Sequence, residues 1–257
     1  MSQPVILAIA NQKGGVGKTT TAVNLGAALA RKGKKTLIVD ADPQGNASTG
    51  LGIAAEEREA NLYGVLAGST RAQDAIKQTS QDNLHILPAN QDLAAMEVEL
   101  VEAEARNFSF RDRLKEAADT YDVVLIDCPP ALGLLTLNSL AWADKVLVPL
   151  QAEFFALEGL AFLLRTLHRV KRGSNASLQL LGVVLTMYDG RNRLAQQVEN
   201  DVRTHLQGRV FETKIPRNVR LSEAPSHAQP IFDYDERSTG AQAYAALSDE
   251  IVSTLGL

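Results

Sequence analysis

Short apolar runs recur along the chain, separated by longer stretches in which apolar residues follow a helical spacing. The apolar runs occupy residues 5–10, 36–40, 84–88, 122–127, 145–149, 180–187 and 210–215. Most of them are continuously apolar rather than alternating, which is expected of strands covered on both faces. We therefore predict a mostly parallel, twisted β-sheet.

The intervening stretches carry helix-forming residues at helical spacing. They occupy residues 20–32, 92–105, 109–118, 157–172, 194–206 and 241–255. Because strands and helices alternate, helices are expected on both faces of the sheet. The sequence contains no repeat, low-complexity tract or long linker, so residues 1–257 are predicted to form a single α/β domain.

Composition narrows the class of protein. Hydrophobic residues make up 45% of the chain, enough for the core of a two-sided sheet, and Cys128 is the only cysteine. An intramolecular disulfide and a multi-cysteine metal site are therefore excluded within one chain, which favours a reducing compartment. The longest apolar stretch, residues 154–164, contains Glu158 and Gly159. It is shorter than a membrane span and predicts a buried or interfacial helix.

A glycine-rich segment follows the first predicted strand: residues 11–20 read NQKGGVGKTT. Glycines at this position let backbone N–H groups converge on a phosphate at the start of a helix, Lys18 supplies a counter-charge, and Thr19 offers a hydroxyl to Mg²⁺. The segment therefore predicts a P-loop, which would make the chain a P-loop NTPase. The residues expected to contact the nucleotide are Lys13, Gly14, Gly15, Val16, Gly17, Lys18, Thr19 and Thr20.

This segment departs from the general P-loop pattern. Gln12 stands where the pattern has its first glycine, and Lys13 is an additional cation. A second lysine is redundant within one copy, because Lys18 already neutralises the phosphates. It is explained if Lys13 reaches a nucleotide held by another copy of the chain. An ordinary P-loop with a surface lysine is the alternative.

Two other predicted strands end in carboxylates. Asp40 and Asp42 close the second run, and Asp127 closes the fourth. The carboxyl ends of parallel strands meet at one edge of the sheet, where ligands bind, and an apolar strand followed by Asp is typical of a Mg²⁺ site in nucleotide hydrolases. For Asp40 and Asp42, a solvated Asp-Pro turn is the alternative.

The charge of the chain is unevenly distributed. The formal net charge is -4, yet residues 186–220 contain seven Lys or Arg against four Asp or Glu. Local positive charge can bind DNA phosphates without reading bases. The alternative is a solvated rim with internal salt bridges. A second basic run, residues 165–172, would be an auxiliary patch or would cap its helix.

These motifs resemble the ParA/MinD ATPase family. The loop from Lys13 to Thr19, the strand ends at Asp40 and Asp127, and the blocks 151–159, 185–191 and 215–226 look like its chromosomal ParA/Soj branch in particular. The resemblance implies ATP and Mg²⁺ as cofactors and slow ATP hydrolysis. It assigns catalysis to Lys13, Lys18 and Asp42, and magnesium binding to Thr19, Asp40 and Asp127.

The resemblance also implies how the protein acts. Met187 and Pro216 would line the adenine pocket, and Arg191, Arg217 and Arg220 would contact double-stranded DNA without sequence preference. The expected assembly is an ATP-bound homodimer that is cytoplasmic and nucleoid-associated, does not bind membranes, and is stimulated by a ParB-like partner. The expected role is partitioning of a chromosome or plasmid.

Three other functions are alternatives. A MinD-like membrane-cycling ATPase would need a basic amphipathic helix near the C-terminus, whereas residues 249–257 are acidic and short. An iron–sulfur reductase of the nitrogenase iron-protein kind would need two cysteines per chain. A ParA-like positioner of non-DNA cargo would use the same ATPase site, and the sequence does not distinguish it.

Overall fold

The computed structural model describes residues 3–102 and 109–257. In this part of the chain, eight strands form one sheet in the order β3-β4-β2-β5-β1-β6-β7-β8. The strands are β1 (Val5–Ile9), β2 (Thr36–Asp40), β3 (Lys77–Gln78), β4 (Leu84–Leu87), β5 (Val123–Asp127), β6 (Lys145–Gln151), β7 (Gln179–Tyr188) and β8 (Val210–Pro216). Neighbouring strands are parallel except β3 with β4. The prediction of a mostly parallel sheet is confirmed.

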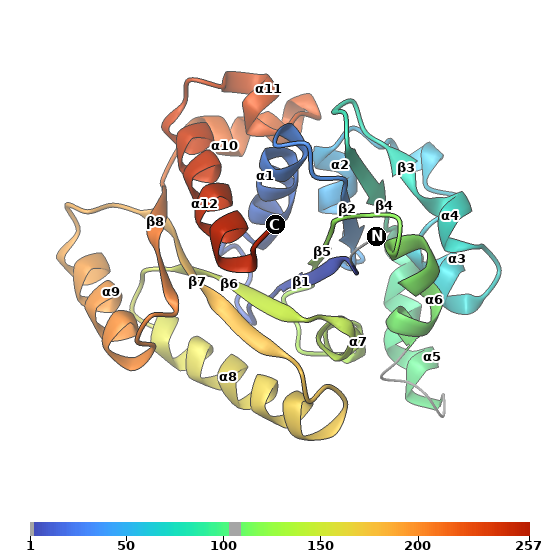
Figure 1. The fold of residues 1–257 in the computed structure, drawn as a ribbon, viewed down its shortest axis with the longest axis horizontal. Helices are drawn as coiled ribbons and strands as arrows, with labels where there is room; N and C mark the ends of the chain where they lie inside the picture. The colour runs from blue at the N-terminus through green and yellow to red at the C-terminus, as the bar shows by residue number, and fades with distance from the viewer. Residues whose placement is uncertain (1–2, 103–108) are drawn as a thin grey trace.

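Helices cover both faces of this sheet, also as predicted. In Figure 1, α1 and α12 lie above the sheet and α7 and α8 below it. The α-helices are α1 (Lys18–Arg31), α2 (Asn46–Gly50), α3 (Leu62–Ala67), α4 (Ala72–Ala75), α5 (Met96–Glu102), α6 (Ser109–Ala118), α7 (Leu134–Trp142), α8 (Ala156–Gly173), α9 (Arg193–His205), α10 (Val219–Glu223), α11 (Ile231–Asp235) and α12 (Thr239–Leu255). Short 3₁₀ helices occupy η1 (Ala55–Glu57), η2 (Gln91–Ala95) and η3 (Ala224–His227).

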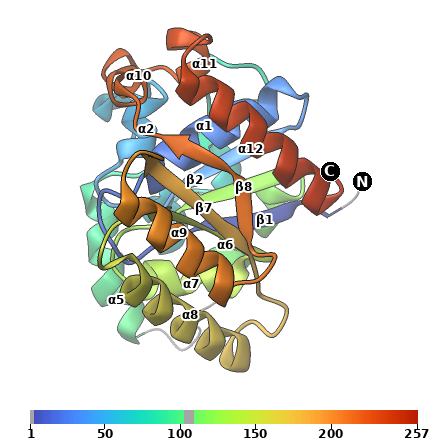
Figure 2. The same ribbon diagram turned by 90° about the vertical axis from the view of Figure 1, so that its left-hand side faces the viewer.

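The central strands are continuously apolar because they contribute to two cores. Along β1, Ile6 and Ala8 belong to one core, and Leu7 and Ile9 belong to the other. Figure 2 shows the same division at the far edge, with α12 on one side of β7 and β8 and α8 and α9 on the other. The packing is close: a Cβ added to Gly26 of α1 would lie 2.8 Å from Ile38 Cδ1 of β2.

Some elements differ from the predicted ones. The helix expected over residues 92–105 begins as the 3₁₀ segment η2 and continues as α5, and residues 103–105 lie outside the described residues. Helix α7 was not predicted, because most of its residues are buried and no apolar stripe marks it. The stretch 154–164 contains the start of α8, but Phe154 and Phe155 precede the helix and are exposed.

The sheet brings the predicted site residues to one edge. Asp127 at the end of β5 is the register partner of both Asp40 on β2 and Ile9 on β1. The glycine-rich loop follows β1 directly, so it shares this edge with both carboxylates. Among the residues described here, no helix is long and apolar enough to cross a bilayer.

Candidate nucleotide-binding site

The glycine-rich loop joins β1 to α1 and is held by residues from distant strands. Gly15 and Gly17 have φ angles of +74° and +85°, which only glycine adopts without strain. The Asn11 amide donates to the carbonyl of Pro149 at 2.7 Å, and the Thr186 hydroxyl donates to the carbonyl of Val16 at 2.8 Å. The ends of β6 and β7 therefore fix the loop on which phosphate binding is predicted.

The two lysines of this loop point in different directions. Lys18 is 6% exposed, and its ammonium donates to the carbonyl of Lys13 at 3.0 Å. Burial lowers the pKa of Lys18, while the carboxylates of Asp127 and Asp42 oppose this effect. The Lys13 side chain is 43% exposed and forms an ion pair with Glu153, which follows β6. One ammonium thus lies inside the site and the other at its surface.

Asp127 is the least satisfied polar group of the site. Its side chain is fully buried, and neither carboxylate oxygen has a regular hydrogen-bond partner among the described residues. Burial and then the nearby Asp40 raise its pKa well above the ordinary value, although the Thr19 hydroxyl beside it acts in the opposite direction. Buried carboxylates normally have donors or bind cations, so Asp127, Thr19 and Lys18 fit a magnesium–triphosphate group.

A magnesium ion here would share its ligands with the nucleotide. No group of three or more His, Cys, Asp or Glu residues in the described part of the chain is arranged to hold a metal by itself. Mg²⁺ typically binds one or two protein carboxylates and completes its shell with phosphate oxygens and water. The single orphaned carboxylate of Asp127 suits that mode of binding.

Asp40 is turned toward α2 rather than left without partners. Its Oδ2 accepts the backbone N–H of Ser48 at 2.9 Å and the Ser48 hydroxyl at 2.7 Å. Complete burial raises the pKa of Asp40 to about 6, and the bonds from Ser48 oppose the rise. Asp42 accepts the backbone N–H of Gln44 at 2.9 Å. Asp40 therefore fixes the segment that carries Asp42, and its predicted contact with magnesium stays a prediction.

A cavity of about 280 Å³ adjoins the loop at the ends of β7 and β8. Met187 and Pro216, the residues predicted for the adenine pocket, both line it, together with Gly17, Thr20 and Tyr244. Met187 has a φ of +49°, a left-handed conformation that non-glycine residues adopt only when their surroundings hold them there. The cavity opens beside the first turn of α1, where the phosphates are expected.

Of the arginines predicted to contact DNA, Arg191 and Arg217 lie on the loops that follow β7 and β8, and Arg220 lies on α10. Arg191 has a 91% exposed side chain and forms a bidentate pair with Asp189 at 2.9 and 3.0 Å. Hydrogen bonds from Arg191 lower the pKa of Asp189 to about 2, and exposed Arg217 adds to the effect. Arg220 pairs with Glu223 at 3.0 Å and Asp235 at 3.4 Å.

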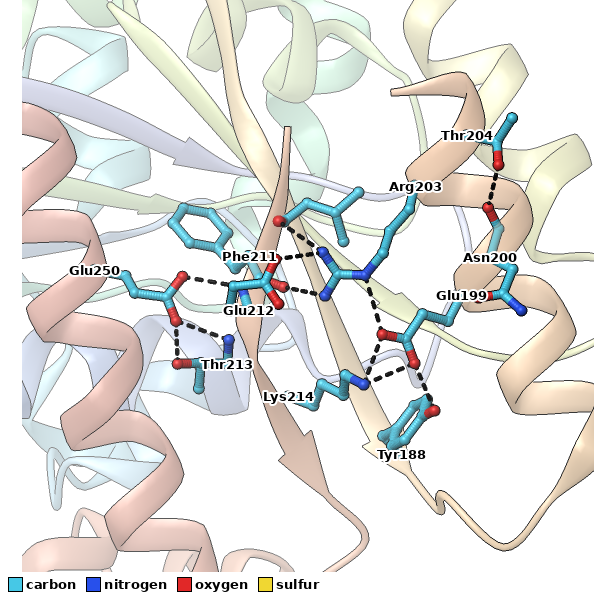
Figure 3. Close-up of polar contacts among 11 residues, drawn as sticks. Tyr188, Glu199, Asn200, Arg203, Thr204, Phe211, Glu212, Thr213, Lys214 and Glu250 are labelled. Atoms are coloured by element: carbon cyan, nitrogen blue, oxygen red, sulfur yellow. Dashed lines mark hydrogen bonds and ion pairs between the residues drawn. The ribbon is translucent and has the colours of Figure 1, made fainter. Parts of the chain in front are cut away.

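Other cations of residues 186–220 are bound internally. Arg203 and Lys214 both pair with Glu199 of α9, as Figure 3 shows, and Arg209 donates to the carbonyl of Leu180. The internal salt bridges considered from the sequence are therefore present for Arg203 and Lys214, whereas Arg209 is held by a backbone carbonyl. Apart from Arg209, the exposed cations of this segment are Arg191, Arg193, Arg217 and Arg220.

Comparisons with known proteins show the family of this chain. A family model described as an AAA domain matches residues 5–180. The chromosome partitioning protein ParA of Caulobacter vibrioides is 53% identical over 250 residues, covering 96% of this chain and 94% of the relative. This chain belongs to the ParA/Soj family of chromosome-partitioning ATPases. The sporulation initiation inhibitor protein Soj of Bacillus subtilis is 49% identical, covering 96% of this chain and 98% of the relative.

Solved structures extend the family match to the fold and the ligands. A cobyrinic acid a,c-diamide synthase from Mycobacterium smegmatis, crystallised with an ATP analogue and magnesium, is 37% identical with a TM-score of 0.88, covering 99% of this chain and 96% of that one. The cell-division ATPase MinD of Pyrococcus furiosus is 29% identical with a TM-score of 0.80, covering 98% and 99% of the two chains. The predicted P-loop fold, ATPase activity, ATP and Mg²⁺ are confirmed.

Several residues that shape the site were not predicted. Asn11 and Thr186 hold the loop, Ser48 holds Asp40, and Glu153 holds Lys13. Glu97 of α5 accepts the backbone N–H groups of Leu134 and Leu135 at 2.6 and 3.1 Å, where α7 begins. Asn11 and Ser48 flank the motifs, so proximity could have singled them out. No local signal marks the other three.

Proposed function

We propose that this ParA/Soj family member forms an ATP-bound homodimer that binds double-stranded DNA without sequence preference, and that hydrolysis, stimulated by a ParB-like partner, releases it. The protein would thereby partition a chromosome or plasmid on the nucleoid. The observation that carries this proposal is the placement of the two loop lysines. Buried Lys18 serves the nucleotide of its own chain, whereas Lys13 sits at the surface, where a second copy can approach.

Each site residue has a role in this proposal. Lys18 and the loop N–H groups bind the phosphates, Thr19 and Asp127 bind Mg²⁺, and Asp40 positions the segment carrying Asp42. Asp42 orients the attacking water. Phosphoryl transfer depends mainly on positioning and charge neutralisation, so strong proton abstraction by Asp42 is not required. Mg²⁺, when bound, neutralises charge that develops on the phosphates.

DNA binding follows from dimerisation. Arg191, Arg217 and Arg220 of one copy offer only a few phosphate contacts. A dimer presents the patch twice on one rigid body and gains avidity through effective concentration. ATP-dependent dimerisation therefore becomes ATP-dependent DNA binding, with an affinity that decreases steeply as salt concentration rises.

DNA binding without nucleotide, with ADP and with ATP tests the proposal over a salt series. We expect binding only with ATP, on any sequence, with a slope of log K against log[salt] of roughly -0.9 per neutralised phosphate. Lys13→Ala should lose both the dimer and DNA binding, and Arg220→Glu should keep the dimer and lose DNA binding. Equal DNA retention without ATP, or a salt-independent affinity, would overturn the proposal.

A further inference from the structure

The carboxylate of Glu199 joins β7 and β8, the two strands whose ends line the cavity predicted to bind adenine. Glu199 lies on α9 with an 11% exposed side chain. It accepts the Tyr188 hydroxyl at 2.5 Å, the Lys214 ammonium at 2.7 Å and Arg203 Nε at 3.0 Å. Figure 3 shows these three donors converging on it from β7, β8 and α9. Although burial opposes ionisation, the hydrogen bonds from Lys214, Tyr188 and Arg203 lower the pKa of Glu199, so the group is a stable anion.

Two of these donors are neighbours of the pocket residues. Tyr188 directly follows Met187, and Lys214 precedes Pro216 by two residues. Met187 and Pro216 line the cavity at the adjacent ends of the parallel strands β7 and β8. The Lys214 ammonium also lies 4.6 Å from the centroid of the Tyr188 ring, a cation–π contact. Glu199 is therefore connected to both walls of the pocket through side chains adjacent to its lining.

Backbone hydrogen bonds between β7 and β8 are interrupted near the cavity. The ladder between β7 and β8 is irregular between Val183 and Leu185 and again between Leu185 and Tyr188. Met187, within the second irregularity, has a left-handed backbone. Such a conformation persists only where surrounding contacts determine it. The bonds to Glu199 supply side-chain contacts at the point where the ladder is interrupted.

The same bonds close the loop that carries Arg191. The loop runs from Tyr188 at the end of β7 to Arg193 at the start of α9. The Tyr188 hydroxyl and Glu199 of α9 are joined across it. Any movement of Tyr188 with the pocket therefore moves one anchor of the Arg191 loop.

We propose that Glu199 is a positioning residue that holds the nucleotide-base pocket and the Arg191 loop in one arrangement, so that base binding and DNA binding both depend on it. The inference deepens the proposed function and rests on it for the identity of the DNA ligand. Glu199 itself does not line the cavity.

The chain offers a matched control on the other side of β8. Glu250 of α12 accepts the backbone N–H groups of Glu212 and Thr213 at 3.0 and 2.7 Å. It thus also fixes β8, but at residues outside the pocket lining. Glu250→Gln should disturb the strand about as much as Glu199→Gln, without reaching Met187 or Pro216.

The test compares the affinity of Glu199→Ala, Glu199→Gln and Glu250→Gln for ATP and for inorganic tripolyphosphate, without DNA. For Glu199→Ala we expect ATP affinity to fall roughly tenfold, as for loss of a charged hydrogen bond. Tripolyphosphate affinity should not change, because that probe has no base. Glu199→Gln keeps an acceptor for Tyr188 and should recover part of the loss, and Glu250→Gln should retain wild-type affinity for both probes.

A second arm measures DNA affinity of the same proteins at saturating ATP, with thermal unfolding confirming that each is folded. Glu199→Ala should bind DNA several-fold more weakly than Glu250→Gln. The pocket role would be overturned if Glu199→Ala kept wild-type ATP affinity or lost affinity for ATP and tripolyphosphate equally. It would also be overturned if Glu250→Gln lost as much ATP affinity as Glu199→Ala. Normal DNA affinity of Glu199→Ala would overturn the coupling. Absence of DNA binding by the wild type would instead refute the proposed function, while the nucleotide arm still tests the pocket.

Discussion

Lys13 forms an ion pair with Glu153 of its own chain, joining the loop after β1 to the segment after β6. The two side chains are 43% and 33% exposed. An adjoining cavity is lined by Lys13, Phe155 and Glu158. In the monomer, the lysine assigned to the partner's nucleotide is therefore already bound to a carboxylate. In the proposed dimer, Lys13 would exchange that carboxylate for a phosphate of the partner's nucleotide.

Glu153→Gln should release Lys13 and strengthen the ATP-bound dimer. A partly exposed ion pair contributes about 0.2–1 kcal/mol and the symmetric dimer breaks two of them, so the dimer dissociation constant should fall by roughly two- to thirtyfold. Sedimentation velocity over a protein concentration series with ATP measures it. Glu158→Gln removes the same charge from the same surface without touching the ion pair and should change little. Equal effects of the two variants would mean that only net charge matters.

Ligand-free stability should depend on pH through the buried carboxylates. The pKa values of Asp40 and Asp127 are raised in the folded protein, that of Asp40 to about 6. The folded state then binds more protons than the unfolded state between the ordinary pKa of about 4 and the raised value. The free energy of unfolding should decrease as pH rises through this window and then level off. Thermal unfolding from pH 4.5 to 8 without nucleotide checks the direction.

Asp127→Asn should reduce that pH dependence. It should also raise the stability of the ligand-free protein while weakening the binding of Mg²⁺ and ATP. At pH 7.5 we expect the ligand-free variant to be more stable by about 1–3 kcal/mol, because it removes a buried carboxyl group that lies beside Asp40 and has no regular hydrogen-bond partner among the described residues. Added Mg²⁺ and ATP should raise its unfolding temperature much less than that of the wild type. If Mg²⁺ and ATP stabilise both proteins equally, Asp127 is not a magnesium ligand.

The sequence was sufficient to predict those parts of the site that consist of contiguous motifs. The glycine-rich loop and the strand ending in Asp127 are contiguous motifs, and their shared edge follows from parallel strand order. The strands were identifiable because burial on both faces leaves continuous apolar runs. Helix α7 was not predicted for the same physical reason, since burial around most of its circumference removes the helical period.

The contacts that adjust the site were not predictable, because they join distant parts of the chain. Thr186 bonds Val16 across 170 residues, and Lys13 meets Glu153 only when β1 and β6 lie side by side. The basic count of residues 186–220 did not show which cations are paired internally. Arg191 pairs with Asp189 within its own exposed loop, whereas Arg203 pairs with Glu199 of α9 and with Glu212 of β8.

Asp42→Ala should slow hydrolysis while leaving ATP binding intact. Asp42 shares the edge of the sheet with Lys18 and Asp127, and its charge acts on both. Loss of a group that orients the attacking water costs roughly 100-fold or more in turnover. The variant should accumulate as an ATP-bound dimer on DNA, which single-turnover phosphate release and DNA retention would show together. Asp42→Asn keeps an acceptor for the Gln44 N–H and controls for loop structure. Rapid hydrolysis by Asp42→Ala would assign the water-positioning role to another residue.

Asp189→Asn should strengthen DNA binding, because Asp189 competes with phosphates for the arginines of the patch. It forms a bidentate pair with Arg191, and Arg217 also acts on its charge. Releasing Arg191 in both copies of the dimer should add about two phosphate contacts and steepen the slope of log K against log[salt] by about 1.8. Asp201→Asn on α9 makes the same charge change away from these arginines and should leave the slope unchanged. Because bulk charge acts on affinity wherever it sits, equal slopes for the two variants would show that Arg191 makes no phosphate contact of its own.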